Sequence, residues 1–270
     1  MESAIPGELA RFRDAYGAHR AAEGRAHKGG ELFDLPYLAK GPLARQWGVR
    51  ARTFDAFMRR LLRPMAAELG RPVDLVDLGA GNGWLCYRAA MEGHRCTALD
   101  IREDEVDGLG ASGEYLAAKP GLFERAISSF DSLPLPSHAV DLAVFNASLH
   151  YALDLAVTLK EAVRVVRPGG MVVILDSPFY RSERAGAAMA AEKKAQSGHS
   201  FGARAGELLA LPFVEYLTRD SLRGASAALG LEWRRHRILY PLWYELRPLA
   251  AALRRRRPPS RFDMWSARRP

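Results

Sequence analysis

The 270-residue chain has an ordinary globular composition, with 48% hydrophobic and 26% charged residues, which excludes a disordered chain. Its length allows one large α/β domain or two small ones. Two cysteines, Cys86 and Cys96, are too few for a disulfide framework or a cysteine metal cluster, so we expect a reducing cytoplasm and no metal site.

The formal net charge is +8, and much of the excess lies near the C-terminus. A basic surface of this kind can bind nucleic acid or anionic lipid. A solvated arginine-rich face also accounts for the excess charge, and this is the favoured interpretation. The arginines concerned are Arg234, Arg235, Arg237, Arg247, Arg254, Arg255, Arg256, Arg257, Arg261, Arg268 and Arg269.

The hydropathy pattern predicts a chain without a secretory signal, because the first residues include acids and have no apolar core. No uncharged apolar run approaches the ~20 residues that span a bilayer. We therefore expect no integral membrane segment.

The first seventy residues predict helices. One covers residues 7–23, and a second covers residues 43–69 with a break near Pro64, where a proline ring would disturb the helix. The second helix has apolar side chains at helical spacing that should face a core: Trp47, Phe54, Phe57, Met58, Leu61 and Leu62.

From residue 73 short apolar runs alternate with helical stretches, which predicts βαβ units around a parallel sheet. The expected strands are 73–78, 95–100, 123–128, 139–146 and 171–175, and the expected helices are 84–92 and 155–166. Pro168 should stop the second helix and Gly169 and Gly170 should reverse the chain.

After Asp176 the pattern changes. Residues 177–214 contain an Ala-rich helix and a Gly/His/Phe loop, which together resemble an insertion. We expect a helix over 221–229, a strand over 231–240, a basic helix over 242–256 and a last, antiparallel strand over 262–268.

The most informative segment is an apolar strand that leads into Gly79, Gly81 and Gly83 and then into a helix. Glycines allow a tight turn and a close approach of a ligand to the backbone. Asp100 follows 21 residues after Gly79, at the end of the next strand, where a carboxylate can accept hydrogen bonds from both ribose hydroxyls of an adenosine ligand.

The arrangement D-x-G-x-G-x-G from Asp77 to Gly83, with Trp84 where a dinucleotide fingerprint has glycine, resembles motif I of class I S-adenosylmethionine (SAM)-dependent methyltransferases. Segments 133–146 and 164–174 are similar to the ubiquinone/menaquinone-biosynthesis-type, or Methyltransf_11-like, members. The resemblance implies a Rossmann-like fold whose mostly parallel seven-stranded sheet ends in an antiparallel strand.

The resemblance also implies which residues bind the cofactor SAM. The glycine loop should hold its methionine part and Asp100 its ribose. Family members often have an acid where Ser129 stands, so the adenine contacts here should differ. Ser129 and Phe130 can recognise adenine through a hydroxyl and a ring contact, and Asp131 is expected to cap the turn instead. The complete expected set is Asp77, Gly79, Ala80, Gly81, Gly83, Asp100, Ile101, Ser129, Phe130 and Asn146.

His150 follows the fourth strand and is the expected catalytic base, because imidazole titrates near neutral pH; a cofactor-packing role is the alternative. The expected substrate-binding residues are Tyr37, Tyr151, Tyr180 and His199. Further candidates are Tyr16, His19, Trp47 and Arg50, for which ordinary packing or a surface salt bridge is the favoured explanation, and Asp176, Phe201, Tyr240, Trp243 and Tyr244, for which packing is the alternative.

These features predict a single methyltransferase domain over residues 1–270. Its parts are a helical cap (1–70), a SAM-binding core (71–176), an insertion lining the acceptor site (177–217) and a C-terminal completion of the sheet (218–270). The expected acceptor is a small molecule, lipid-like or a secondary metabolite. The alternatives are an RNA or protein methyltransferase that uses the basic surface, or a non-catalytic SAM-binding protein. Peripheral membrane contact through residues 242–257 and the oligomeric state stay open.

Overall fold

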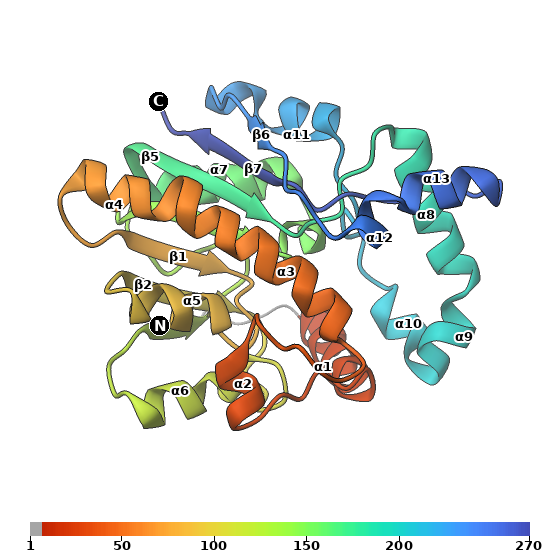
Figure 1. The fold of residues 1–270 in the computed structure, drawn as a ribbon, viewed down its shortest axis with the longest axis horizontal. Helices are drawn as coiled ribbons and strands as arrows, with labels where there is room; N and C mark the ends of the chain where they lie inside the picture. The colour runs from red at the N-terminus through yellow and green to blue at the C-terminus, as the bar shows by residue number, and fades with distance from the viewer. Residues whose placement is uncertain (1–6) are drawn as a thin grey trace.

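A computed structural model describes residues 7–270, which form a seven-stranded mixed sheet flanked by helices (Figure 1). The strand order is β3-β2-β1-β4-β5-β7-β6; β1 to β5 are parallel, and β7 is antiparallel to both β5 and β6. This confirms the predicted fold. The strands are β1 (Asp74–Leu78), β2 (Arg95–Asp100), β3 (Glu124–Ile127), β4 (Val140–Asn146), β5 (Val166–Leu175), β6 (Arg234–His236) and β7 (Met264–Arg268).

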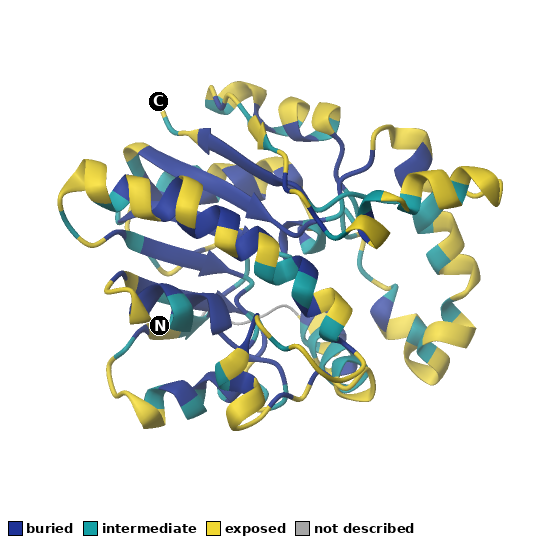
Figure 2. Cartoon of the chain, viewed as in Figure 1, coloured by how far each residue is buried: buried dark blue, intermediate teal, exposed yellow. Residues whose placement is uncertain are grey.

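Helices cover both faces of the sheet: α3, α4 and α5 pack on one face, and α7 and α11 on the other. The central strands are therefore buried on both sides (Figure 2), which explains their continuous apolar sequences. The helices are α1 (Gly7–Ala22), α2 (Gly30–Asp34), α3 (Ala44–Phe57), α4 (Arg63–Leu69), α5 (Trp84–Met91), α6 (Gly113–Ala118), α7 (Leu155–Val165), α8 (Glu183–Ala195), α9 (Ser197–Phe201), α10 (Ala205–Leu208), α11 (Arg219–Ser226), α12 (Leu242–Glu245) and α13 (Arg247–Leu253).

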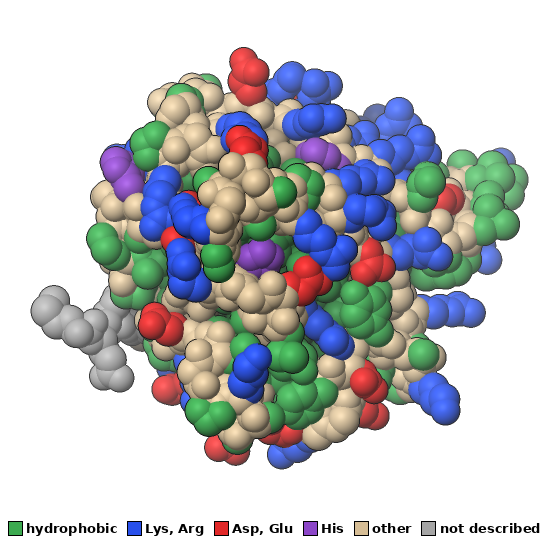
Figure 3. Space-filling view, turned by 60° about the vertical axis from the view of Figure 1, so that its left-hand side comes forward, with side chains coloured by type: hydrophobic (Ala, Val, Ile, Leu, Met, Phe, Trp, Pro, Cys, Tyr) green, Lys and Arg blue, Asp and Glu red, His purple; other side chains and the backbone are tan. Residues whose placement is uncertain are grey.

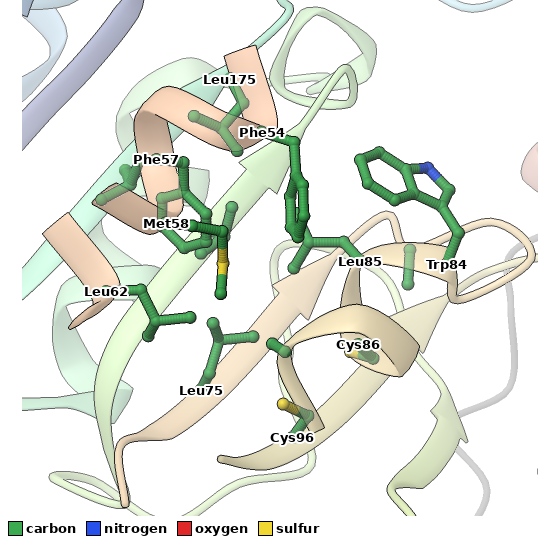
Figure 4. Close-up of a cluster of buried hydrophobic side chains, with 14 of the residues drawn as sticks. Phe54, Phe57, Met58, Leu62, Leu75, Trp84, Leu85, Cys86, Cys96 and Leu175 are labelled. Atoms are coloured by element: carbon green, nitrogen blue, oxygen red, sulfur yellow. The ribbon is translucent and has the colours of Figure 1, made fainter. Parts of the chain in front are cut away.

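The predicted break near Pro64 is wrong. Helix α3 continues through a π-helical turn, Met58–Leu62, directly into α4. Pro64 lies in the first turn of α4, and the wider π turn before it accommodates the ring. The six predicted core side chains of this segment are all buried, and Figure 4 shows several of them facing Leu75 and Leu85.

The turn before β5 differs from the prediction. Helix α7 ends at Val165, close to the predicted end before Pro168, but β5 begins at once, so Pro168 and Gly169 lie inside the strand and not in a turn before it. The register with β4 shifts at this place, as at a β-bulge, which tolerates proline. Gly170 is required there, because a Cβ atom would lie 2.6 Å from the carbonyl oxygen of Asp141.

The C-terminal elements are shorter than predicted. The Gly/His/Phe loop is the short helix α9, and the strand expected over 231–240 is confined to β6. The basic helix expected over 242–256 is split at Leu246 into α12 and α13. Pro248 explains this split, because a proline is tolerated in the first turn of a helix but not in its interior.

Candidate functional site

A cavity of about 910 Å³ lies at the carboxyl ends of the parallel strands. Gly79 after β1, Asp100 of β2, Asn146 of β4 and Asp176 after β5 all line it, and α1 and α3 supply the opposite wall. Open α/β sheets bind ligands at this edge.

The glycine loop forms one wall and depends on its glycines. Gly79, Gly81 and Gly83 have φ values of 78°, 56° and 76°, a region that side-chain-bearing residues rarely adopt. A Cβ atom on Gly79 would also lie 2.4 Å from Cβ of Ser148. The backbone N–H groups of Gly79 and Ala80 donate to the carbonyl oxygen of Leu99, at 2.8 and 3.0 Å, which anchors the loop to the end of β2.

Asp100 faces this loop from the end of β2. Its Oδ2 accepts a 2.7 Å hydrogen bond from the N–H of Gly81, and its Oδ1 accepts a 2.9 Å bond from the N–H of Arg102. Burial raises the pKa of this carboxyl. Each oxygen keeps a lone pair, so the carboxylate can also accept from ligand hydroxyls.

A buried polar cluster beside the loop was not predicted. Asp107 accepts hydrogen bonds from Arg20 (2.6 Å), Arg102 (3.4 Å) and the amide of Asn82 (3.2 Å). All four residues line the cavity. Asp107 thus connects Arg20 of α1 to Asn82 of the glycine loop. Asn82, between two glycines of the motif, was the one member that the pattern could have indicated.

The end of β4 and the segment that follows it contribute unpartnered polar atoms. Asn146 Oδ1 and His150 Nδ1 are buried and have no hydrogen-bond partner among the described residues. Burial, with a further contribution from the positive charges of Lys193, Arg50 and Arg20, lowers the pKa of His150 to about 3. The imidazole is therefore neutral near pH 7 and a weak base. The hydroxyls of Tyr151 and Tyr16 lie 2.9 Å apart.

The turn after β3 places Ser129, Phe130 and Asp131 on the cavity wall. The hydroxyl of Ser129 donates to Asp131, so an acid does lie beside the position where the sequence pattern lacks one. Phe130 packs against Phe145 at 5.7 Å between ring centroids.

The structure brings together many but not all of the predicted site residues. Asp77 is fully buried behind the loop, and its carboxylate oxygens have no hydrogen-bond partner among residues 7–270; burial raises the pKa of this carboxyl well above the usual value. The predicted residues that line the cavity are Tyr16, Trp47, Arg50, Gly79, Ala80, Gly81, Asp100, Ile101, Ser129, Phe130, Asn146, His150, Tyr151, Asp176, Trp243 and Tyr244.

The remaining candidates lie off the cavity wall. Tyr37 is 47% exposed and donates to Asp55; Tyr180 contacts Tyr216 and Arg257; His199 is exposed on α9. The others of this group are His19, Asp77, Gly83, Phe201 and Tyr240. Among the described residues, no three His, Cys, Asp or Glu side chains are grouped as metal ligands.

The family model described as "Methyltransferase domain" matches residues 76–174. Curated relatives include malonyl-[acyl-carrier protein] O-methyltransferases from Hahella chejuensis, 27% identical over 156 residues, and from Pseudescherichia vulneris, 30% identical over 146 residues. These matches cover 54% and 51% of this chain and 54% of each relative. The chain thus spans about half the length of the curated relatives it matches.

Solved structures share the fold. The Burkholderia thailandensis 1,6-didemethyltoxoflavin-N1-methyltransferase, solved with S-adenosylhomocysteine (SAH), has a TM-score of 0.56 at 18% identity and aligns with 100% of this chain and 92% of its own. The Haemonchus contortus phosphoethanolamine N-methyltransferase 2, solved with SAM, has a TM-score of 0.62 at 13% identity, covering 96% of this chain and 60% of its own. The family match, the curated relatives and the geometry of the site together support a class I SAM-dependent methyltransferase domain over residues 76–174, with SAM as its cofactor.

Proposed function

We propose that the chain transfers a methyl group from SAM to a small-molecule acceptor in the 910 Å³ cavity. The observation that carries this proposal is the glycine loop facing the Asp100 carboxylate inside a cavity that continues past β4 to Asp176. Bound SAM supplies a methyl group on a positively charged sulfur. The protein's own contribution is alignment of the acceptor and exclusion of water.

The cofactor half of the cavity is the part around β1 and β2. We assign the backbone of Gly79, Ala80 and Gly81 to the aminoacyl tail and Asp100 to the ribose. Asn146 lines the cavity at the end of β4, and we assign its side-chain amide to the amino group of the tail. Ile101, Ser129 and Phe130 are assigned to the adenosine, while Asp77 and Gly83 shape the loop from behind.

The acceptor half has an aromatic wall. Tyr151, Phe213, Trp243, Tyr244 and Phe262 line it, which suits an apolar acceptor, lipid-like or a secondary metabolite. Residues between Glu8 and Arg50 of the helical cap, and between Pro178 and Phe213 of the insertion, supply part of the cavity lining, which supports the proposed four-part division. The O-methylation named for the curated relatives supports oxygen as the acceptor atom. We assign His150 a hydrogen-bonding role as a neutral imidazole.

The RNA or protein alternative is less well supported. Basic side chains gather over the upper right of the face in Figure 3, but several C-terminal arginines are engaged within the chain. Arg235 pairs with Asp263, and Arg261 pairs with Glu245. Arg257 pairs with Glu192. Arginines held in this way are less available to phosphate groups.

A two-part experiment tests the proposed function. Calorimetry should detect binding of SAM and SAH to the purified protein, and label from [methyl-³H]SAM should pass to the low-molecular-weight fraction of an extract of the producing cells. Label in RNA or protein would support the alternative. Binding without any transfer would indicate a non-catalytic SAM-binding protein. Absence of binding would contradict the assignment of the glycine loop and Asp100 to the cofactor.

We further propose peripheral membrane contact through the α12–α13 surface. No helix in the described part of the chain is long and apolar enough to span a bilayer, but this surface exposes large apolar side chains beside the exposed Arg254, Arg255 and Arg256. Trp243 belongs both to the surface and to the cavity wall, so the surface borders the site. Its exposed apolar members are Leu239, Leu242, Trp243, Leu246, Leu249 and Leu253.

The expected result is sedimentation with vesicles that contain phosphatidylglycerol and about 100-fold weaker binding to phosphatidylcholine, because each surface arginine contributes about 1 kcal/mol on anionic lipid. Substitution of Leu249 and Leu253 by glutamate should abolish the binding. Met91→Glu on α5, which is 51% exposed, is the matched control. Equal sedimentation of all three proteins would contradict the proposal.

We propose a cytoplasmic location because the two cysteines of the chain are present as free thiols. Cys86 and Cys96 are buried and free and lie near each other in Figure 4, which fits a reducing compartment.

A further inference from the structure

Asp176 occupies a special position at the end of β5. It is the first residue after the strand and adopts a φ of 49°, in the left-handed region where non-glycine residues are uncommon. Its side chain is buried but lines the cavity. A backbone strained in this way is usually maintained at functional sites.

One oxygen of Asp176 is held by the protein and the other is free for a ligand. Thr53 on α3 donates a 2.7 Å hydrogen bond to Oδ1, and Thr53 Oγ1 also lies 2.8 Å from the Tyr240 hydroxyl. Among the described residues, Oδ2 has no hydrogen-bond partner. It does not belong to the unpartnered side-chain atoms that are completely buried, so it is accessible. It therefore has contact with the cavity.

The sheet order places Asp176 on the acceptor side. Asp100 ends β2, and β1, β4 and β5 follow in that order, so Asp176 is three strands, about 14 Å, from the ribose acceptor. The glycine loop and Asn146 lie between them at the ends of β1 and β4. Asp176 therefore lies on the part of the cavity that would be left for the acceptor if Asp100 and the loop held the cofactor.

Resting on the function proposed above, we propose that Asp176 is the catalytic base of this enzyme and that the acceptor is an aromatic compound methylated on an acidic, phenol-type hydroxyl. Oδ2 accepts the hydroxyl proton. The acceptor oxygen forms a bond to the methyl carbon, and the electron pair of the broken carbon–sulfur bond stays on the sulfur. The proton leaves Asp176 for water after the ether product departs.

The electrostatics of the cavity fit this role. Burial raises the pKa of Asp176 to about 7, against the opposing effects of the Arg50 charge and the Thr53 hydrogen bond. The groups that face it are Arg50 on α3 and the phenols of Tyr240 and Tyr244. A base near neutrality is best matched to proton transfer at physiological pH, whereas the pKa of His150 is far lower.

The acceptor class follows from the same groups. A phenol has a pKa of about 10, so it needs a base, and its ring fits the aromatic wall. A carboxylate acceptor needs no base, and the charge of Asp176 would repel it. The two classes are chemically distinguishable, because mild alkali hydrolyses a methyl ester but leaves an aryl methyl ether intact.

The test combines Asp176→Asn with analysis of the labelled product. Asparagine tolerates the left-handed region and can still accept from Thr53, so the fold and SAH affinity should persist. The rate constant kcat should fall by about 10²–10⁴-fold, and the ascending limb of the native pH–rate profile near pH 7 should disappear. Asp220→Asn, an exposed carboxylate on α11, should behave as the native protein.

Each outcome decides the question. The ³H-methyl product should survive alkali and release methyl iodide in hot hydriodic acid. Alkali-labile label, or label that resists hydriodic acid as N-methyl groups do, overturns the acceptor class. If kcat of Asp176→Asn falls by less than tenfold, or if the pH–rate profile of the native protein has no ascending limb near pH 7, Asp176 is not the catalytic base. If Asp176→Asn fails to bind SAH, the Thr53→Val variant provides the test. The Thr53 hydrogen bond lowers the pKa of Asp176, so the ascending limb of the pH–rate profile of Thr53→Val must move to higher pH. SAH binding without transfer by the native protein removes the proposed function itself.

Discussion

Replacing Asp100 by alanine should weaken SAH binding by about 10²–10⁴-fold. A hydrogen bond to a charged group contributes about 1.5–3 kcal/mol. Under the assignment proposed above the carboxylate accepts from two ribose hydroxyls, which gives about 3–6 kcal/mol, or two to four powers of ten. Titration calorimetry with SAH measures the effect directly.

The control must separate ribose binding from loop support, because Asp100 Oδ2 also accepts from the N–H of Gly81 at 2.7 Å. Asp100→Asn retains one oxygen and the side-chain volume, so its affinity should fall between those of the native and alanine proteins. Asp220→Ala on the exposed face of α11 controls for loss of a carboxylate elsewhere. An Asp100→Ala protein with native affinity would contradict the assignment of Asp100 to the ribose.

The fold and the position of the glycine loop beside Asp100 were predictable because their determinants are local. An apolar strand, a glycine loop and a strand-terminal acid are contiguous in sequence, and parallel connectivity then places Gly79 and Asp100 at the same sheet edge. The predicted strand over 95–100 coincides with β2, and the other core strands differ from prediction mainly at their first residues.

The polar cluster around Asp107 and the role of Asp176 depend on long-range contacts and were not predictable in the same way. Arg20 reaches Asp107 across 87 residues, and no periodicity records that pairing. The role proposed for Asp176 depends on its left-handed backbone conformation and on its hydrogen bond from Thr53, which lies 123 residues earlier in the chain. Tyr37 and His199 were proposed from segments that often close over such sites, but whether a side chain points inward is decided by tertiary packing.

Gly79→Ala should both destabilise the protein and abolish measurable SAH binding. Alanine in the left-handed region costs about 1–2 kcal/mol, and forcing a methyl group into a packed site costs about 1–3 kcal/mol more. The methyl group would overlap Cβ of Ser148 at 2.4 Å and approach the Phe130 ring at 3.1 Å. The free energy of unfolding should therefore fall by about 2–5 kcal/mol, measured by urea denaturation.

Gly93→Ala isolates the backbone contribution. Gly93 has a φ of 93°, but a Cβ atom there would meet nothing within 4 Å. This variant should lose only the conformational part, about 1–2 kcal/mol, and should bind SAH with native affinity because it lies at the opposite end of α5 from the glycine loop. If Gly79→Ala behaves like Gly93→Ala in both measurements, the loop has room for a side chain, and its close packing against Ser148 is not what shapes the cofactor site.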